Sequence, residues 1–233
     1  MKSFFEMIKM ALFPPKCIRC GSYTDPDECL CEDCRELWEK EKRARCNKCG
    51  KPHVECSCPI SLETSRLFGV FHLAEYKKET VATELVYKIK DGEHTPVNSF
   101  LAQEIYDILK NREDFSEAVI TYVPRRREAI KKYGSDQAYE LAKAICEISD
   151  KEIRSLFTRR GNKEQKNMNS EQRHKNVRNS YFAKEGIEDE VCGKRVFIVD
   201  DIITTGSTVS YLADILLDHG AKSVSAVSVA RKT

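Results

Sequence analysis

The sequence predicts an α/β protein, with a parallel sheet flanked by helices, preceded by a small cysteine-rich segment that binds metal. Three observations support this fold class. After residue 60, short apolar runs suited to buried strands alternate with helical patterns. Nine of the 11 cysteines lie between Cys17 and Cys58. A chain of 233 residues that is 41% hydrophobic can hold one full α/β domain and a smaller unit.

The chain begins with a short amphipathic pattern. Apolar residues recur every four positions from Phe4 to Leu12, and a proline pair follows at 14–15, so we expect a helix over residues 1–13. Its three charged residues argue against a signal peptide. We expect this helix to pack against its own domain rather than on a membrane surface, and no stretch approaches a membrane span.

The cysteine spacing predicts two closed zinc sites. Three of the four cysteine pairs are CxxC turns, which present two sulfurs to one ion at tetrahedral geometry. Four thiolates leave no open position for a catalytic water, so we expect about two structural zinc ions that supply folding energy to a segment too small for a large core. The expected ligand pairs are Cys17 and Cys20, Cys31 and Cys34, Cys46 and Cys49, and Cys56 and Cys58.

The ligand set has alternatives. Cys29 and His53 are spare donors, either of which could replace a nearby cysteine, and an interleaved pairing would also serve two ions. An iron–sulfur cluster accepts four thiolates as well, but regular CxxC turns favour zinc. The clustering argues against disulfides and for a reducing, cytoplasmic location. Composition changes after Pro59, so we expect domains at residues 1–60 and 61–233.

The rest of the chain alternates strands with helices. We expect, in order, a strand over Arg66 to Tyr76, helices over Lys78 to Ile89 and Val97 to Lys110, a strand over Ala118 to Val123, a helix from about Gln137, strands over Ile153 to Phe157 and at Tyr181 to Phe182, and a last strand over Ser223 to Ala230. In such a parallel sheet, ligands bind beyond the carboxyl ends of the strands.

Two basic stretches adjoin these elements. Arg125, Arg126 and Arg127 follow a strand end, where a pyrophosphate would need positive charge and backbone donors. Residues 158–175 have little apolar pattern and carry six basic residues against two acidic ones, so we interpret them as a lid over pyrophosphate. A solvated surface run and simple disorder are the alternatives. The whole chain has a formal net charge of only +2, too small to indicate nucleic-acid binding by itself.

The most informative stretch runs from Val196 to Val209. Four apolar residues, too few for a helix, favour a strand buried on both faces, and Asp200 and Asp201 stand at its end. A helical pattern then covers Val209 to His219. The loop between holds small residues, Thr204, Thr205, Gly206, Ser207 and Thr208. Such a loop aims backbone N–H groups and a helix amino terminus at one point, which favours a bound phosphate.

The two acids suit groups beside that phosphate. They would repel the phosphate on contact, so we expect them to bind ribose hydroxyls or a divalent metal. A phosphate beside a diol indicates a ribose 5-phosphate. The arrangement closely resembles the signature of the type I phosphoribosyltransferases, whose substrate is phosphoribosyl pyrophosphate (PRPP) with magnesium. An ordinary buried strand and turn is the alternative interpretation.

A cysteine-rich zinc segment joined to such a domain resembles the ComF family, phosphoribosyltransferase-like proteins associated with DNA uptake in competent bacteria. The resemblance covers nearly the full chain. One departure concerns the family's Arg-Gly-Phe-Asn-Gln element, which reads Tyr133-Gly134-Ser135-Asp136-Gln137 here and so lacks its arginine, although Lys132 is adjacent. Other family positions match at Pro124, Arg160, Gln165, Arg173, Asn176, Val177 and Phe182.

The resemblance implies a type I phosphoribosyltransferase fold with catalytic Asp200 and Asp201, and with PRPP held by the 204–208 loop and by Arg125, Arg126, Arg160 and Arg173. Three functions compete: transfer of phosphoribosyl to or from an acceptor, binding of single-stranded DNA or a DNA-uptake helicase, and sensing of PRPP without turnover. Because three residues follow the last expected strand, we expect any acceptor pocket to come from residues 61–114 or the zinc segment.

Overall fold

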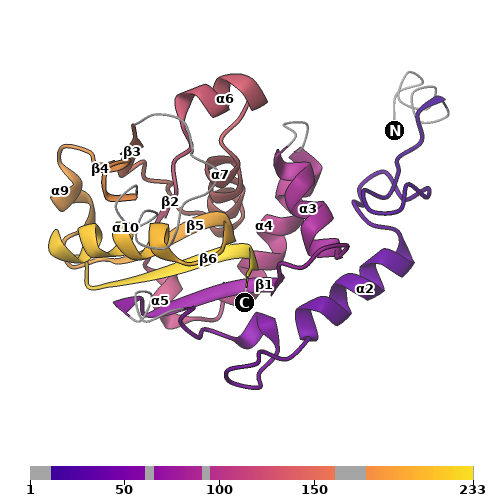
Figure 1. Cartoon of the computed structure of the whole chain (residues 1–233), viewed down its shortest axis with the longest axis horizontal. Helices are drawn as coiled ribbons and strands as arrows, with labels where there is room; N and C mark the ends of the chain where they lie inside the picture. The colour runs from indigo at the N-terminus through magenta and orange to yellow at the C-terminus, as the bar shows by residue number, and fades with distance from the viewer. Residues whose placement is uncertain (1–11, 61–65, 91–94, 161–176, 233) are drawn as a thin grey trace.

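The computed structural model describes residues 12–60, 66–90, 95–160 and 177–232, and its core is a parallel sheet with helices on both sides (Figure 1). The four strands lie in the order β1-β6-β5-β2, and every neighbouring pair is parallel. They are β1 (Gly69–Glu75), β2 (Val119–Tyr122), β5 (Arg195–Ile203) and β6 (Ser223–Arg231). The predicted α/β fold with a parallel sheet is confirmed.

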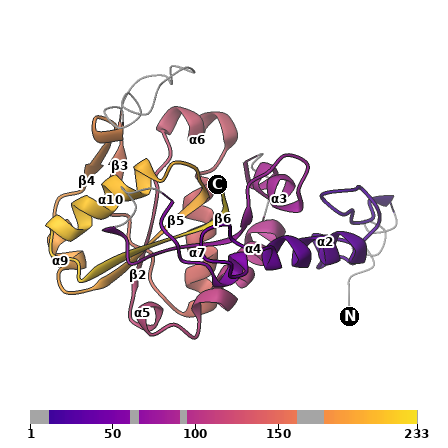
Figure 2. The same cartoon turned by 60° about the horizontal axis from the view of Figure 1, so that its bottom comes forward.

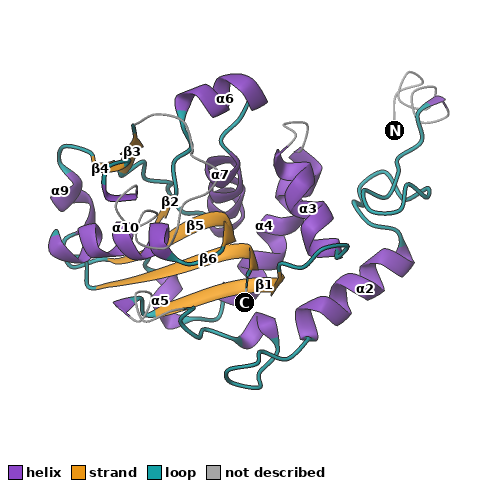
Figure 3. Cartoon of the chain, viewed as in Figure 1, coloured by secondary structure: helices purple, strands orange, loops and turns teal. Residues whose placement is uncertain are grey.

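Helices cover both faces of this sheet, which is why its strands are nearly continuous apolar runs (Figure 3). Three helices pack on the face of β5 that carries Phe197 and Val199: α3 (Val81–Lys90), α4 (Thr95–Leu109) and α7 (Gln137–Ser149). On the opposite face, α10 (Ser207–Asp218) and the short α9 (Ile187–Val191) pack against Val196 and Ile198. The alternation of side chains along β5 therefore fills two cores.

Two predicted boundaries are wrong. The strand expected over Ile153 to Phe157 makes only a single bridge, from Ile153 to Ile120, because the chain then leaves the sheet. Strand pairing resumes as β3 (Phe157–Arg159), which pairs antiparallel with β4 (Tyr181–Ala183), so Thr158 and Arg159 belong to a strand and not to a lid. The strand expected to stop at Val199 also continues through both aspartates to Ile203.

Several short helices were not predicted. They are α2 (Glu32–Arg43), the 3₁₀ turn η1 (His53–Glu55), α5 (Glu113–Ser116), α6 (Arg127–Tyr133) and α9. Residues 161–175 of the expected lid, which include Arg173, and residues 1–11 of the expected first helix lie outside the described residues. Within the described ranges, no helix has both the length and the apolar character needed to cross a membrane.

The cysteine-rich segment lies along the edge of the core, and α2 docks it there (Figure 2). Trp38 is fully buried in the same cluster as residues of α4, and its indole N–H donates to the Glu104 carboxylate (3.2 Å). Glu41 accepts from the backbone N–H groups of Val81 (2.8 Å) and Ala82 (3.0 Å), which satisfies two orphan donors at the start of α3.

Candidate functional site

Two groups of four cysteine sulfurs are preassembled in the amino-terminal segment. In each group all sulfurs lie within 4.8 Å of one another. A tetrahedral zinc site with Zn–S bonds of about 2.3 Å needs sulfurs roughly 3.8 Å apart, so both groups fit the ion. The groups are Cys17, Cys20, Cys31 and Cys34, and Cys46, Cys49, Cys56 and Cys58.

This grouping resolves the alternatives left open by the spacing. The pairs combine in chain order, not interleaved, and neither Cys29 nor His53 belongs to a group. His53 instead contacts the imidazole of His72 on β1, with 3.0 Å between ring nitrogens. A glycine with positive φ follows the first pair of each group, Gly21 at 75° and Gly50 at 70°, and each donates its backbone N–H to the carbonyl of the cysteine four residues before it.

The carboxyl edge of the sheet holds the second candidate site. β5 delivers Asp200 and Asp201 to this edge, and the chain then turns through Gly206 (φ 80°) directly into α10. The turn is held by Ser207, whose backbone N–H donates to Thr205 Oγ1 (3.4 Å) and whose hydroxyl lies 2.9 Å from the same atom. The loop is thus preformed, and the 12-residue helix has no side-chain cap at Gly206, so its amino terminus suits an anion.

The two aspartates differ in their surroundings. Asp201 forms an ion pair with Lys90 at the end of α3 (3.2 Å), whereas burial and then the neighbouring Asp201 charge raise the pKa of Asp200 well above its ordinary value. Each carboxylate also accepts one local backbone N–H, from Asp201 (2.9 Å) and Ile202 (2.7 Å). Added positive charge beside Asp200 would relieve the repulsion, which suits a divalent cation held by the pair.

The β3–β4 hairpin contacts the 204–208 loop through Tyr181. Tyr181 is 3% exposed and hydrogen bonds with Thr208, and burial raises the pKa of its phenol to about 12. Asp200, Arg126 and Arg159 are close enough to influence this phenol, and the Arg159 guanidinium lies 4.9 Å from the Tyr181 ring centroid. The Nε atoms of both arginines are buried and have no hydrogen-bond partner among the described residues. Arg159 at the end of β3 and Arg126 at the start of α6 therefore place two cations near Tyr181, where an anion would satisfy them.

The other predicted arginines lie in different settings. Arg125 donates its backbone N–H to Asp136 (2.8 Å), the residue that caps α7, so the altered Tyr133–Gln137 element still positions the arginine turn. Arg160 is exposed, and its guanidinium lies 5.7 Å from the ring of Phe182. Arg127 belongs to α6 and is exposed.

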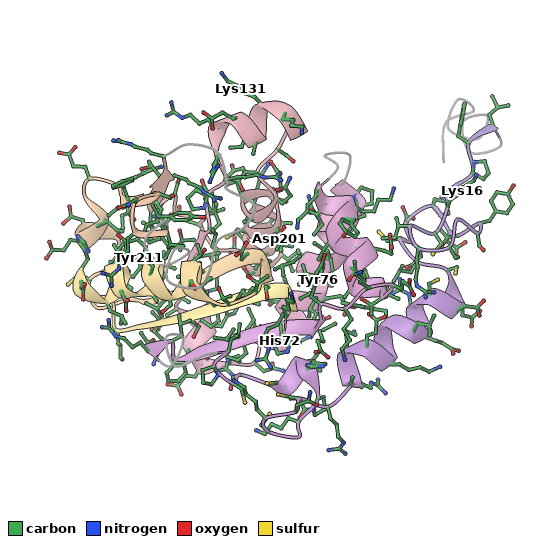
Figure 4. The ribbon with its side chains drawn as sticks, in the orientation of Figure 1. Lys16, His72, Tyr76, Lys131, Asp201 and Tyr211 are labelled. Atoms are coloured by element: carbon green, nitrogen blue, oxygen red, sulfur yellow. The ribbon has the colours of Figure 1, made fainter. Side chains whose placement is uncertain are left out.

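Sequence reasoning did not identify Lys90 and Tyr181 as residues of this site, and it placed Arg159 in a lid and not in a strand. The alternation of side chains in a strand was the available signal for Arg159, because residues 157 and 159 of β3 share one face and Phe157 is buried. A further neighbour is Tyr76, which lies close to Asp201 (Figure 4). Its hydrogen bond with Tyr87, burial and the Asp201 charge together raise its pKa to about 12.

The chain matches two protein families. Residues 129–233 match the phosphoribosyl transferase domain, and residues 8–63 match the double zinc ribbon domain. Competence protein ComFC of Streptococcus pneumoniae is 24% identical over 234 residues, which cover 93% of this chain and 100% of that protein. The chain is similar to ComFC proteins over most of its length. ComFC of Bacillus subtilis is 26% identical over 222 residues, which cover 88% of this chain and 85% of that protein.

The double zinc ribbon match identifies the two four-cysteine groups as structural zinc sites. Among solved structures, the chain is similar to the allosteric regulatory enzyme of purine biosynthesis, with 18% identity and a TM-score of 0.42 over 63% of this chain and 30% of that one. A Trypanosoma cruzi hypoxanthine phosphoribosyl transferase is 16% identical, with a TM-score of 0.34 over 63% and 64% of the two chains. TM-scores this low support no inference about substrate.

Proposed function

We propose that this protein binds PRPP with magnesium at the carboxyl edge of its sheet and transfers the phosphoribosyl group to or from an acceptor. The observation that carries the proposal is the acid pair Asp200–Asp201 standing beside a preformed anion loop at the start of α10. Phosphate and ribose need these two kinds of group side by side. The phosphoribosyl transferase domain match and the ComFC homology support the same assignment.

Each part of the site then has a role. The backbone N–H groups and hydroxyls of the 204–208 loop bind the 5-phosphate, and the two aspartates accept hydrogen bonds from the ribose hydroxyls. Magnesium held by the aspartates would supply positive charge to the pyrophosphate. Arg126 and Arg159 bind the pyrophosphate, with Arg160 and Arg173 as further expected ligands.

Catalysis would be mainly electrostatic. The bond between the anomeric carbon and the pyrophosphate oxygen breaks with its electron pair leaving on pyrophosphate, and the acceptor's lone pair forms the new bond to that carbon. The aspartate carboxylates stabilise the positive charge that develops on the ribose ring. The two arginines stabilise the negative charge on the leaving pyrophosphate, so the site acts on both charges that separate in the transition state.

Isotopically labelled PRPP tests this function. Wild-type protein with magnesium is expected to release pyrophosphate with at least one member of a panel of bases, nucleotides and single-stranded DNA, and the Asp200→Asn variant is expected to release none. Binding of PRPP without release of pyrophosphate in the presence of any acceptor would favour a PRPP-sensing regulator instead. Absence of both binding and release would reject the proposal.

A second candidate function is binding of single-stranded DNA. The specific observation is an exposed surface where Phe182, 41% exposed, lies beside Arg160, while Lys131 and Arg127 are exposed on α6. Bases can stack on an aromatic ring and a guanidinium while basic side chains neutralise phosphates. Fluorescence anisotropy of a labelled oligonucleotide should show affinity that falls steeply with salt and falls further in Phe182→Ala. A DNA-uptake helicase as partner stays a prediction from the homology.

A further inference from the structure

The two zinc sites carry the same charge but differ in what surrounds it. A zinc ion bound by four thiolates has a formal charge of −2, and burying that charge is costly unless a cation or hydrogen-bond donors accompany it. Cys46 and Cys56 of the second site are 2% and 1% exposed, and Cys17 and Cys34 of the first site are 2% exposed. The negative charge of both sites therefore needs a compensating positive charge or hydrogen-bond donors. The cations near each site show how that charge is compensated.

The second site has a buried arginine from the far end of the chain. Arg231, the last residue of β6, is 1% exposed. Its Nη2 atom lies 3.5 Å from Cys46 Sγ, and its Nη1 atom lies 4.0 Å from Cys56 Sγ and donates to the Cys58 carbonyl oxygen (3.0 Å). One guanidinium thus contacts three of the four cysteine residues of that site.

The backbone around Arg231 is held by the sheet. Its carbonyl accepts from the Tyr76 N–H (2.8 Å), it pairs in register with Ile203 of β5, and the Lys232 N–H donates to the Ile203 carbonyl (3.0 Å). The guanidinium therefore reaches the sulfurs from a fixed position in the core. The same backbone connects it to the segment that carries Asp200 and Asp201.

The other polar groups around Arg231 do not provide an alternative partner. The buried His53–His72 pair lies on the same side, where His72 is labelled in Figure 4, and burial followed by the Arg231 charge lowers the pKa of His72 to about 3, so this imidazole is neutral. The carboxylate in register on β1, Glu75, forms an ion pair with Lys77 (2.5 Å). The thiolates remain as the anionic partners for the guanidinium.

The first site is compensated differently. Arg19 donates toward Cys34 Sγ at 3.8 Å, but this arginine is exposed and comes from the same CxxC turn as its site. A solvent-exposed cation stabilises a neighbouring anion only weakly because water screens the attraction, whereas a buried cation stabilises it more strongly. No residue of the sheet contacts the sulfurs of the first site through a hydrogen bond in the described part of the chain.

We infer that Arg231 is the buried countercharge of the second zinc site and that the last strand completes this site, so that its metal occupancy and the carboxyl edge of the sheet depend on each other. The metal occupancy of the first site does not depend on a residue of the sheet. Removal of groups that support zinc ligands typically lowers metal affinity about 10- to 100-fold. The second site should show a loss of this size without Arg231.

Arg231→Met tests the inference in the full-length protein, with Arg19→Met as the matched control. Zinc content after dialysis against graded chelator should fall from two ions to one for Arg231→Met at a chelator concentration that leaves both in wild type and in Arg19→Met. Arg231→Lys, which keeps the charge without the planar fork, should lie between wild type and Arg231→Met. Retention of both ions by Arg231→Met, or equal loss in both methionine variants, would overturn the inference.

Wild-type protein provides a second test if Arg231→Met does not fold. Hydrogen exchange is followed while chelator removes zinc stepwise. The amides of Tyr76 and Lys232 should lose protection in the step that releases the second-site ion, identified by cobalt substitution and by comparison with Cys46→Ser. Unchanged protection of these two amides after release of both ions would contradict the inference.

Discussion

Residues that follow one another in the chain can have different surroundings, as Arg159 at the end of β3 and Arg160 directly after it show. Arg159 lies against buried Tyr181, which hydrogen bonds to Thr208 of the 204–208 loop, and Arg160 lies against exposed Phe182. Both side chains carry the same charge, so a difference in PRPP affinity between their variants would reflect the position of the arginine and not the net charge of the protein. The proposed pyrophosphate role belongs to both, but burial favours a larger contribution from Arg159.

Arg159→Met is expected to weaken PRPP binding about 10- to 100-fold, since one buried charge-assisted hydrogen bond contributes roughly 1.5 to 3 kcal/mol. Arg160→Met, its matched control, should weaken binding by a smaller factor. Calorimetric titration of PRPP with magnesium measures both. Equal losses of PRPP affinity in the two variants would show that the different surroundings of Arg159 and Arg160 do not decide their roles.

Gly206 offers a second test of a single residue. Its φ of 80° is unfavourable for alanine by about 1 kcal/mol, and a shift of this residue would move the loop donors. Gly206→Ala should therefore lose both stability and PRPP affinity. Gly193→Ala, at an exposed turn with φ of 72° and open space where the added methyl group would lie, should lose similar stability and keep its affinity. Denaturant unfolding and calorimetry compare the two.

How far the sequence predicted the site depends on how local each interaction is. Asp200, Asp201 and the 204–208 loop follow one another in the chain, so composition and order were sufficient to place them together. Arg159 and Tyr181 reach the loop only through the β3–β4 hairpin, whose strands are three residues each and are separated by more than 20 positions. Lys90 reaches Asp201 across more than 100 positions, and no local pattern encodes that contact.

At the scale of elements, α2 shows why a helix in the cysteine-rich segment was missed. Only Cys34 and Trp38 of its twelve residues are buried and most of the others are charged, so the helix has too few apolar residues for a helical pattern to be recognised. Its position depends on packing: Trp38 enters the core, and Glu41 caps α3, whose other end carries Lys90. The helix links the cysteine-rich segment to the element that reaches the acid pair.

Trp38→Ala is expected to lower the free energy of unfolding by about 3 to 5 kcal/mol, because it removes a fully buried aromatic side chain. Leu37→Ala changes the neighbouring residue, which is 38% exposed, and should cost less than about 1 kcal/mol. Denaturant unfolding at fixed zinc concentration measures both. A small effect of Trp38→Ala would mean that α2 does not anchor the segment.

At the scale of the whole molecule, the sheet, the amino-terminal segment and the candidate site share contacts. The predicted parallel sheet and paired cysteines were recoverable because each has a repeating local pattern. The division at residue 60 stays a prediction, and Arg231 shows that the cysteine-rich segment depends on the opposite end of the chain. The cytoplasmic location likewise stays a prediction from cysteine usage.

Metal analysis of purified protein should find about two zinc ions per chain. Cys17→Ser and Cys46→Ser should each lose one ion and lower stability, because structural zinc contributes folding free energy. Cys192→Ser, an exposed cysteine outside both groups, should keep both ions. An iron–sulfur absorption spectrum in place of zinc would contradict this assignment.

The central claim is that Asp200 and Asp201 hold the ribose end of PRPP with magnesium. Calorimetry of PRPP with magnesium should show binding by wild type and a loss of about a hundredfold or more when both aspartates are changed to asparagine, since two charge-assisted hydrogen bonds and the metal's anionic partners are removed. A control with the exposed Asp189 and Asp218 changed to asparagine has the same net charge and should bind like wild type. Equal affinity of wild type and the Asp200→Asn, Asp201→Asn protein would contradict the claim.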